Sequence, residues 1–215
     1  MPAIPRIRSI DFLSPQPADP SSGEAEIRVT LEDGSSSAFG ILTPDRVALG
    51  MAEAGKDYSF GSPTLFLKRL DQACLGKAAE AMAGRMGGFW LRYYNSKPLA
   101  AGQVKKLRVG SVELSDIEPK KGPTHGSAAV QVKLSDERQF SILAATPGWF
   151  VEALDKLGLE FYFGPCVLFL SSLQADLARA AVAQMIKGGD QRLCRYDTPR
   201  LTLPQVLADF KAKSA

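Results

Sequence analysis

Two Arg-Tyr dipeptides are the residues of this chain best suited to binding chemistry. They are Arg92-Tyr93 and Arg195-Tyr196. A guanidinium can pair with a phosphate, and an aromatic ring beside it can stack on a nucleic-acid base. Further basic residues lie near the dipeptides in the sequence: Lys105, Lys106, Arg108 and Arg192. These eight residues form a candidate binding site for nucleic acid or an acidic protein partner. The alternatives are a salt bridge between parts of the fold and a solvated charged face.

Residues for catalysis are sparse. His125 is the sole histidine, so a Ser-His-Asp or Cys-His arrangement has to use it. The three cysteines, Cys74, Cys166 and Cys194, do not have metal-ligand spacing, and we expect no metal site. Cys166 follows Gly-Pro at an expected helix start, where the helix dipole lowers a thiol pKa. Its apolar neighbours equally fit a buried structural cysteine. The chain has no glycine-rich phosphate-binding motif, and we expect no cofactor.

These candidate residues belong to a chain that repeats itself. A shift of 103 residues places residues 25–93 on residues 128–196 without a gap, and 17 of these 69 positions are identical. The two Arg-Tyr dipeptides coincide, whereas His125 falls on Ser22 and no cysteine falls on another. Two copies in one chain imply pseudo-two-fold symmetry, as in a fused homodimer. We expect two domains, residues 1–100 and 101–215.

Each copy opens with a strand pattern. Period-2 alternation of apolar and polar residues predicts strands over residues 6–12, 26–31, 37–42, 108–114, 129–134 and 139–144. Asp33 and Asp136 lie at the turns after the second strands, where an Asp side chain bonds its own backbone. Each copy is therefore expected to begin as a three-stranded antiparallel meander.

The first helix of each copy has clear start and stop signals. Thr43-Pro44 and Thr146-Pro147 open it, because Thr caps free N–H groups and Pro at the first helical position loses no hydrogen bond. Gly55 and Gly158 close it in the left-handed conformation that suits a C-cap.

The remainder of each copy is predicted from apolar spacing. A short strand is expected over residues 58–60 and 161–163, followed by a second helical region that starts at residues 61 and 164. A strand over residues 89–94 ends the first copy, and an amphipathic helix over residues 203–211 ends the second. The predicted fold is α+β, a tandem duplication of a β-β-β-α-β-α repeat of about 100 residues. The expected core positions are Leu31, Phe60, Leu67, Leu70, Leu134, Phe163, Leu170 and Leu173.

Composition sets further bounds. The formal net charge is +3, far below that of a typical dedicated nucleic-acid binder. No apolar run approaches the roughly 18 residues that span a bilayer, and residues 1–10 lack the apolar stretch of a signal peptide. An odd number of cysteines argues against a disulfide framework, so we expect a reducing cytoplasm and no membrane partner.

Residues 7–60 resemble the β-rich N-terminal segment of RecX-type regulators of the RecA recombinase. The residues that carry the resemblance are the alternating run 27–34, then Ala38-Phe39-Gly40, then a short helix that ends at Gly55 before a strand. The second copy repeats the pattern with Val130, Val132, Leu134, Asp136 and Ile142. The resemblance implies a shared β-β-β-α module and a role in regulating DNA repair. The three-helix repeats of that family's main body have no counterpart in this sequence.

Two hypotheses of function follow. The first is a non-enzymatic cytoplasmic protein that binds a protein partner or nucleic acid in the groove between the repeats. The second is a small-molecule enzyme or sensor with its site at the same interface. The sequence leaves open whether the repeats pack side by side or exchange strands.

Overall fold

The predicted α+β duplication is confirmed. The computed structural model describes residues 5–60, 65–84, 108–118, 122–188, 196–198 and 201–212. The first repeat contains β1 (Ile7–Phe12), β2 (Glu24–Leu31), β3 (Ser36–Leu42), α1 (Pro44–Glu53), β4 (Tyr58–Ser59), β5 (Leu65–Leu67) and α2 (Gln72–Gly84). The second repeats this order with β6 (Val109–Glu118), β7 (Ser127–Leu134), β8 (Gln139–Ala145), α4 (Pro147–Leu157), β9 (Phe161–Tyr162), β10 (Val167–Leu170) and α5 (Ala175–Met185). A short 3-10 turn (Ile186–Gly188) and helix α7 (Leu203–Ala212) follow.

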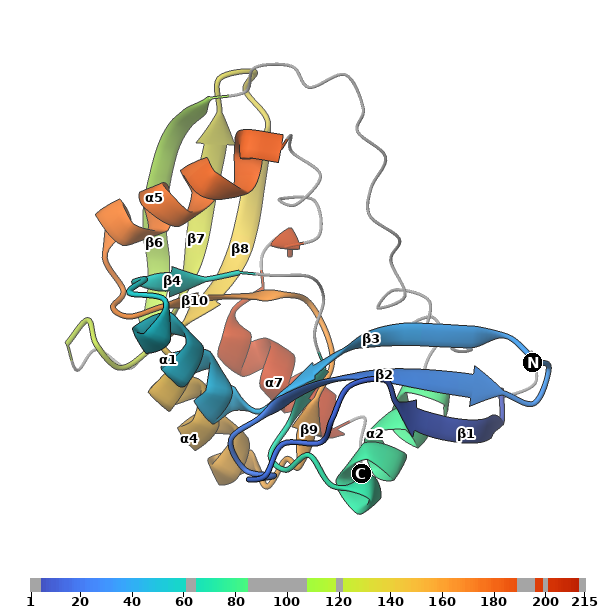
Figure 1. The fold of residues 1–215 in the computed structure, drawn as a ribbon. Coiled ribbons are helices and arrows are strands. Elements are labelled where there is room, and N and C mark those ends of the chain that lie inside the picture. Colours follow the sequence, from blue (N-terminus) through green and yellow to red (C-terminus); the bar gives the residue numbers. More distant parts are fainter. Residues whose placement is uncertain are drawn as a thin grey trace.

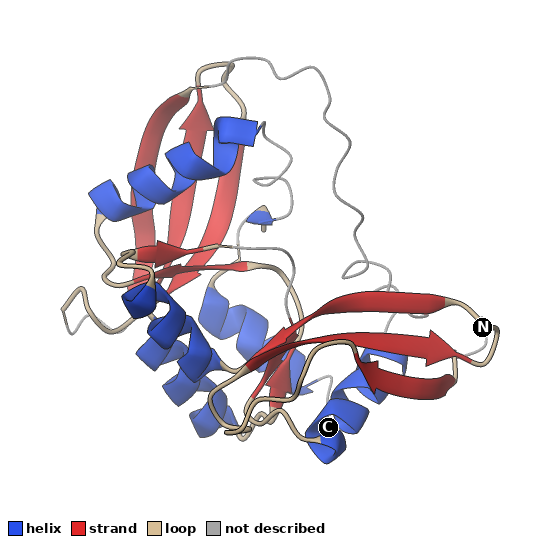
Figure 2. Cartoon of the chain, viewed as in Figure 1, coloured by secondary structure: helices blue, strands red, loops and turns tan. Residues whose placement is uncertain are grey.

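The two repeats exchange strands. The first sheet has the order β1-β2-β3-β5-β9, and the second has the order β6-β7-β8-β10-β4. Each repeat thus donates its shortest strand to the sheet of the other, as the pairing of β4 with β10 shows (Figure 1). The repeats therefore do not pack as two separate sheets side by side. Figure 2 shows α5 across one face of the second sheet, α2 beside the first sheet, and α1, α4 and α7 grouped where the two sheets approach each other.

Both sheets are mixed for the same reason. β1, β2 and β3 form the predicted antiparallel meander, and β5 then pairs with β3 in parallel. A parallel neighbour needs a crossover, and α1 provides it. The second repeat builds the same arrangement with α4 between β8 and β10.

The parallel strand corrects one sequence prediction. Leu67 and Leu170 were expected in the second helical region, but they lie in β5 and β10, and the helices begin only at Gln72 and Ala175. A short apolar run has no period to separate a buried strand from a helix. Cys166 consequently precedes a strand, and the expected helix start at this cysteine is wrong.

The threonines at the helix starts also act differently from the prediction. Thr43 occupies the N-cap position of α1, but its side chain makes no capping hydrogen bond. Its hydroxyl instead accepts the N–H of Gly23 at 2.9 Å, and Thr146 does the same with Gly126 at 3.0 Å. A Cβ at Gly126 would lie 2.6 Å from a backbone oxygen, so only glycine fits there. The threonines therefore tie the start of β2 or β7 to the following helix.

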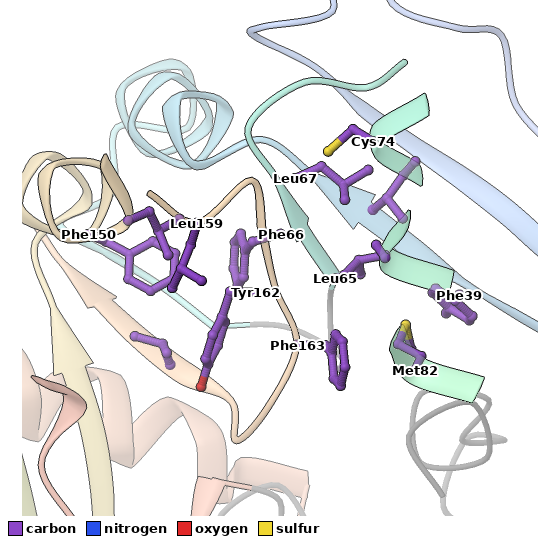
Figure 3. Close-up of a cluster of buried hydrophobic side chains, with 14 of the residues drawn as sticks. Phe39, Leu65, Phe66, Leu67, Cys74, Met82, Phe150, Leu159, Tyr162 and Phe163 are labelled. Carbon is purple, nitrogen blue, oxygen red and sulfur yellow. The ribbon is translucent and has the colours of Figure 1, made fainter. Parts of the chain in front are cut away.

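Residues of both repeats share one core. Figure 3 shows Phe66 from β5 beside Phe150 and Tyr162 from the second repeat. Phe66 and Phe169 occupy equivalent positions in the two repeats, and their ring centroids lie 5.5 Å apart in an edge-to-face contact. Helices α1 and α4 are also equivalent, and they contact each other. Equivalent elements that meet in this way place the pseudo-two-fold axis through the core.

The remaining core expectations hold with two exceptions. Leu31 and Phe60 are half-buried, while the other six positions are buried. Gly55 and Gly158 have positive φ angles of 58° and 64°, as expected at helix ends. None of the described helices combines the length and apolar character needed to cross a membrane.

Helix α7 breaks the symmetry. It packs on α4 and on strands β7 and β8, and it buries Leu203, Leu207 and Phe210. Leu143 and Ala145 of β8 belong to the same apolar cluster and are fully buried. The equivalent residues in the first repeat are Gly40, which is exposed, and Leu42, which is half-buried. The outer face of the second sheet is therefore covered where the corresponding face of the first sheet is open.

Candidate binding grooves

Most of the predicted basic and aromatic site lies outside the described residues. Those members are Arg92, Tyr93, Lys105, Lys106, Arg192 and Arg195. Arg108 is exposed just before β6, and its backbone carbonyl accepts the N–H of Ser135 at 2.9 Å. Tyr196 is only 3% exposed and belongs to the apolar cluster between the second sheet and α5. Its ring is therefore not presented at the surface for base stacking.

A groove beside α1 is the first of two inter-repeat hollows that the sequence did not reveal. We call it the α1 groove. It has a volume of about 450 Å³. It is lined by α1, by one end of the β2–β3 pair where Glu24 and Leu42 lie opposite each other, by residues 56 and 58–60, and by Gln184 of α5. The apolar lining consists of Leu42, Val47, Met51, Ala54, Tyr58 and Phe60. Residues of both repeats line the groove, because β4 of the first repeat is part of the second sheet and contacts α5, which carries Gln184.

The equivalent place in the second repeat is filled. Adding 103 to the lining positions of the α1 groove gives residues of β7, β8, α4 and the segment 159–163. Helix α7 lies on these elements, and Phe210 reaches the rings of Phe161, Tyr162 and Phe163 at centroid distances of 6.0, 5.4 and 5.0 Å. The first repeat therefore presents an open copy of a surface that the second repeat covers with a helix.

A stacked aromatic pair occupies the same place in both grooves. Phe161 and Phe163 lie 6.2 Å apart with an interplanar angle of 3°, and Tyr58 and Phe60 lie 5.9 Å apart at 9°. Phe210 approaches both rings of the first pair edge-on, at 86° and 84°. Tyr58 and Phe60 remain half-buried, so part of their surface is accessible in the α1 groove.

The rim of the α1 groove is charged. Arg46 donates to Glu53 at 2.8 Å and lies 3.8 Å from Glu24. The hydrogen bond to Glu53 raises the pKa of Arg46 above its ordinary value. Lys56 is exposed. Its backbone N–H donates to the carbonyl of Met51 at 2.9 Å, but no hydrogen bond or ion pair joins its side-chain amine to another described residue. Lys56 is therefore the cation of this rim that can receive an anionic group.

The second hollow lies between α1, α2 and α4, and we call it the interface cavity. Its volume is about 540 Å³, and residues of both repeats line it. Its cations are engaged: Lys77 lies 2.6 Å from Glu160, Lys68 pairs with Asp155, and Arg69 pairs with Asp71. The Glu160 carboxylate raises the pKa of Lys77 through their hydrogen bond. The pair with Glu160 therefore favours the charged form of the Lys77 amine.

Cys74 reaches the interface cavity but is not an activated thiol. Its sulfur donates to the backbone carbonyl of Glu160 at 3.4 Å. Burial raises the pKa of the Cys74 thiol, so the thiolate that would attack an electrophile is disfavoured at neutral pH. The corresponding position in the second repeat is Leu177, which agrees with a packing role.

His125 lies on the surface beside a helix. Its Nε2 atom is 2.7 Å from a carboxylate oxygen of Glu152 on α4. Lys156 and His125 together lower the pKa of Glu152. No described histidine, cysteine or carboxylate group forms a cluster of three that could hold a metal ion.

The sequence did contain a signal for the α1 groove. Aligned positions change from apolar in the second repeat to charged or small in the first: Leu157 becomes Ala54, Leu159 becomes Lys56, and Trp149 becomes Arg46. Such one-sided changes indicate a surface that is covered in one repeat only. These positions differ between the repeats, so the residues that are identical in both repeats do not indicate the groove.

Comparison with protein-family models, with curated proteins and with solved structures found no match. The resemblance to RecX-type regulators therefore stays a prediction.

Proposed function

We propose that this chain is a non-enzymatic binding protein whose α1 groove receives a segment of a protein partner. One observation carries the proposal. The equivalent surface of the second repeat buries Leu203, Leu207 and Phe210 of α7, while the α1 groove keeps apolar side chains at an open surface. Binding surfaces are typically apolar at the centre and polar at the rim. The α1 groove has this arrangement, with Met51 and Phe60 inside and Lys56 and Glu24 at the edge.

The chemistry of the described side chains supports a binding role over catalysis. A catalytic acid or base usually has a pKa displaced toward neutrality. In the interface cavity, Lys77 has a raised pKa and stays charged, and Cys74 has a raised pKa and stays protonated. We further propose a cytoplasmic location, because Cys74 and Cys166 are both buried free thiols.

A small-molecule sensor is the second candidate. The interface cavity favours it, because its volume of about 540 Å³ lies within the range of ligand pockets and both repeats line it. Asp45 of α1 and Lys68, which follows β5, both line the cavity and would then contact the ligand. A fragment screen by NMR tests this candidate. Shifts confined to the lining of the cavity support it, and shifts confined to the α1 groove favour the protein-binding proposal.

Site-specific crosslinking tests the protein-binding proposal. A photoreactive phenylalanine analogue is placed at Gly50, where a Cβ has only Arg46 Nη1 nearby at 3.8 Å. The matched control is Ala48, which is exposed on the same helix and does not line the groove. A partner that is captured at position 50 and not at position 48 is then purified.

Calorimetry with the purified partner completes the test. Gly50→Trp fills the groove, and we expect it to weaken binding by at least about tenfold, a change of roughly 1.4 kcal/mol. Ala48→Trp is expected to leave affinity unchanged. Equal effects of the two variants, or equal capture at both positions, would overturn the proposal. Circular dichroism establishes that both variants are folded.

A further inference from the structure

We infer that the occupant of the α1 groove is an acidic amphipathic helix of the partner, with a bulky aromatic anchor near its C-terminal end. This inference rests on the proposed function above. It deepens that function because it states the secondary structure, the anchor spacing and the charge of the bound segment. The helix α7 and the differences between the two grooves supply the argument.

Helix α7 shows how this surface binds a helix. Its buried residues Leu203, Leu207 and Phe210 are spaced i, i+4 and i+7, so they form one stripe. Amphipathic helices enter apolar grooves with this spacing. Because the α1 groove is made from equivalent elements in the same order, a helix with the same spacing matches its length and direction.

The aromatic anchor follows from the stacked pair. Phe210 contacts Phe161 and Phe163 edge-on, and edge-to-face contacts are a favoured arrangement of aromatic rings. Tyr58 and Phe60 reproduce that stacked pair in the α1 groove. An aromatic side chain at the third anchor position of the partner helix would make the equivalent contact.

The expected size of the anchor side chains follows from bulky residues that the second repeat has and the first repeat lacks. Three lining residues of the α1 groove, Arg46, Ala54 and Ser59, correspond to the bulky Trp149, Leu157 and Tyr162 of the second repeat. Ala54 and Ser59 are smaller than Leu157 and Tyr162, so they leave open volume in the α1 groove. The partner helix must fill that space to reach the packing density of a protein interior. We therefore expect tryptophan or phenylalanine at the anchor that faces Ala54 and Ser59.

The acidic character follows from Lys56. Its counterpart is Leu159, which is 7% exposed and belongs to the core that both repeats share. Lys56 places a cation at this point of the groove, and among the described residues no hydrogen bond or ion pair engages its side-chain ammonium group. A carboxylate on the flank of the partner helix would pair with this ammonium group. A second copy of α7 is a poorer occupant, because its own anchors are already buried and its last turn carries Lys211.

Designed peptides test the inference on the whole protein. The first is a stapled helix with the α7 anchor spacing, tryptophan at the Phe210 position and glutamates at exposed positions. The second has the same composition with its anchors scrambled, and the third has lysines in place of the glutamates. Fluorescence anisotropy measures affinity, and NMR shifts of Tyr58 and Phe60 locate binding.

The expected order of affinity separates the alternatives. The first peptide should bind about tenfold more tightly than either control, which corresponds to roughly 1.4 kcal/mol. Lys56→Glu should reverse the preference between the acidic and basic peptides. Equal affinities for the first and scrambled peptides, or shifts away from the α1 groove, would refute the inference. If a partner captured at Gly50 still binds in that case, the proposed function stands and only the helical occupant is rejected.

Discussion

The outer faces of the two sheets derive from one repeated sequence but differ in their surroundings. In the second sheet, Ala129 and Leu143 are buried, whereas the equivalent Glu26 and Gly40 are exposed in the first. Helix α7 covers the second sheet at β7 and β8. The difference shows that residue character on a sheet face follows from whether another element covers it, since buried polar groups without partners are destabilising. The inner faces, which are packed in both repeats, have kept their apolar character.

Separating the repeats tests the strongest link between them. If a protease site inserted between residues 95 and 105 is cut, we expect the two fragments to elute together with the mass of the intact 23.1 kDa chain. Each sheet contains a strand of the other repeat, so dissociation would break both sheets and expose the shared core. Size-exclusion chromatography without denaturant measures this, with an uncleavable site as the control. Two separately eluting folded fragments would contradict the exchange of β4 and β9.

Emptying the filled groove makes the two repeats more alike. Phe210→Ala is expected to lower the free energy of unfolding by about 3–5 kcal/mol, because Phe210 is buried among three aromatic rings. Phe60→Ala, at a half-buried position inside the α1 groove, should have a smaller effect of about 1–2 kcal/mol. Urea titration measures both, and exposed Lys211→Ala serves as the control on α7. Equal losses at positions 210 and 60 would mean that the grooves do not differ in packing.

A single substitution in α1 makes it more similar to α4. Gly50 corresponds to Ala153, and a Cβ at Gly50 has only one neighbour, at 3.8 Å. Gly50→Ala should therefore stabilise the protein by up to about 1 kcal/mol, because glycine is a poor helix former. The reverse change, Ala153→Gly, should destabilise it by a similar amount. A thermal melt of each variant measures the effect, and destabilisation by Gly50→Ala would show that the groove tolerates no added atom there.

The turns that contain Asp33 and Asp136 are equivalent in the two repeats, and we expect the smallest effect for this comparison. Hydrogen bonds from the Ser35 hydroxyl and N–H lower the pKa of Asp33, whereas the Arg138 side chain is the first cause of the lowered pKa of Asp136. Each carboxylate stabilises the fold above its ordinary pKa of 3.8, and this stabilisation is lost as the pH falls through the lowered value.

Salt should separate these two turns. In about 1 M salt the screening length falls to about 3 Å, so the pKa of Asp136 should rise toward its ordinary value more than that of Asp33. NMR titration of both carboxyl carbons at low and high salt measures the difference. The variant Arg138→Gln should reproduce the effect of salt at Asp136 and leave Asp33 unchanged. Equal salt responses would indicate that the two turns are held by the same kind of contact.

Local patterns predicted much of the fold because they depend on neighbouring residues. The meander strands, the helix that ends at Gly158 and the final helix near residues 203–211 were recognised from periodicity and caps. The β5 and β10 strands were missed, since three or four apolar residues fit a strand or a buried helix equally well. The Thr43 hydroxyl was assigned to the nearest N–H groups, while its partner Gly23 lies twenty residues away.

The features of the candidate site also divide into those that the sequence determines and those that depend on tertiary structure. The sequence by itself determined the duplication, the α+β class and an amphipathic helix over residues 203–211, because these follow from residue identity and spacing. Tertiary structure alone decided which sheet β4 and β9 join, since a two-residue strand carries no information about its partner. It also decided that α7 covers the second repeat and leaves the α1 groove open. The physical reason is that the hydrophobic effect is non-directional. An apolar stripe therefore predicts that a surface will be buried, but it does not identify the element that buries it.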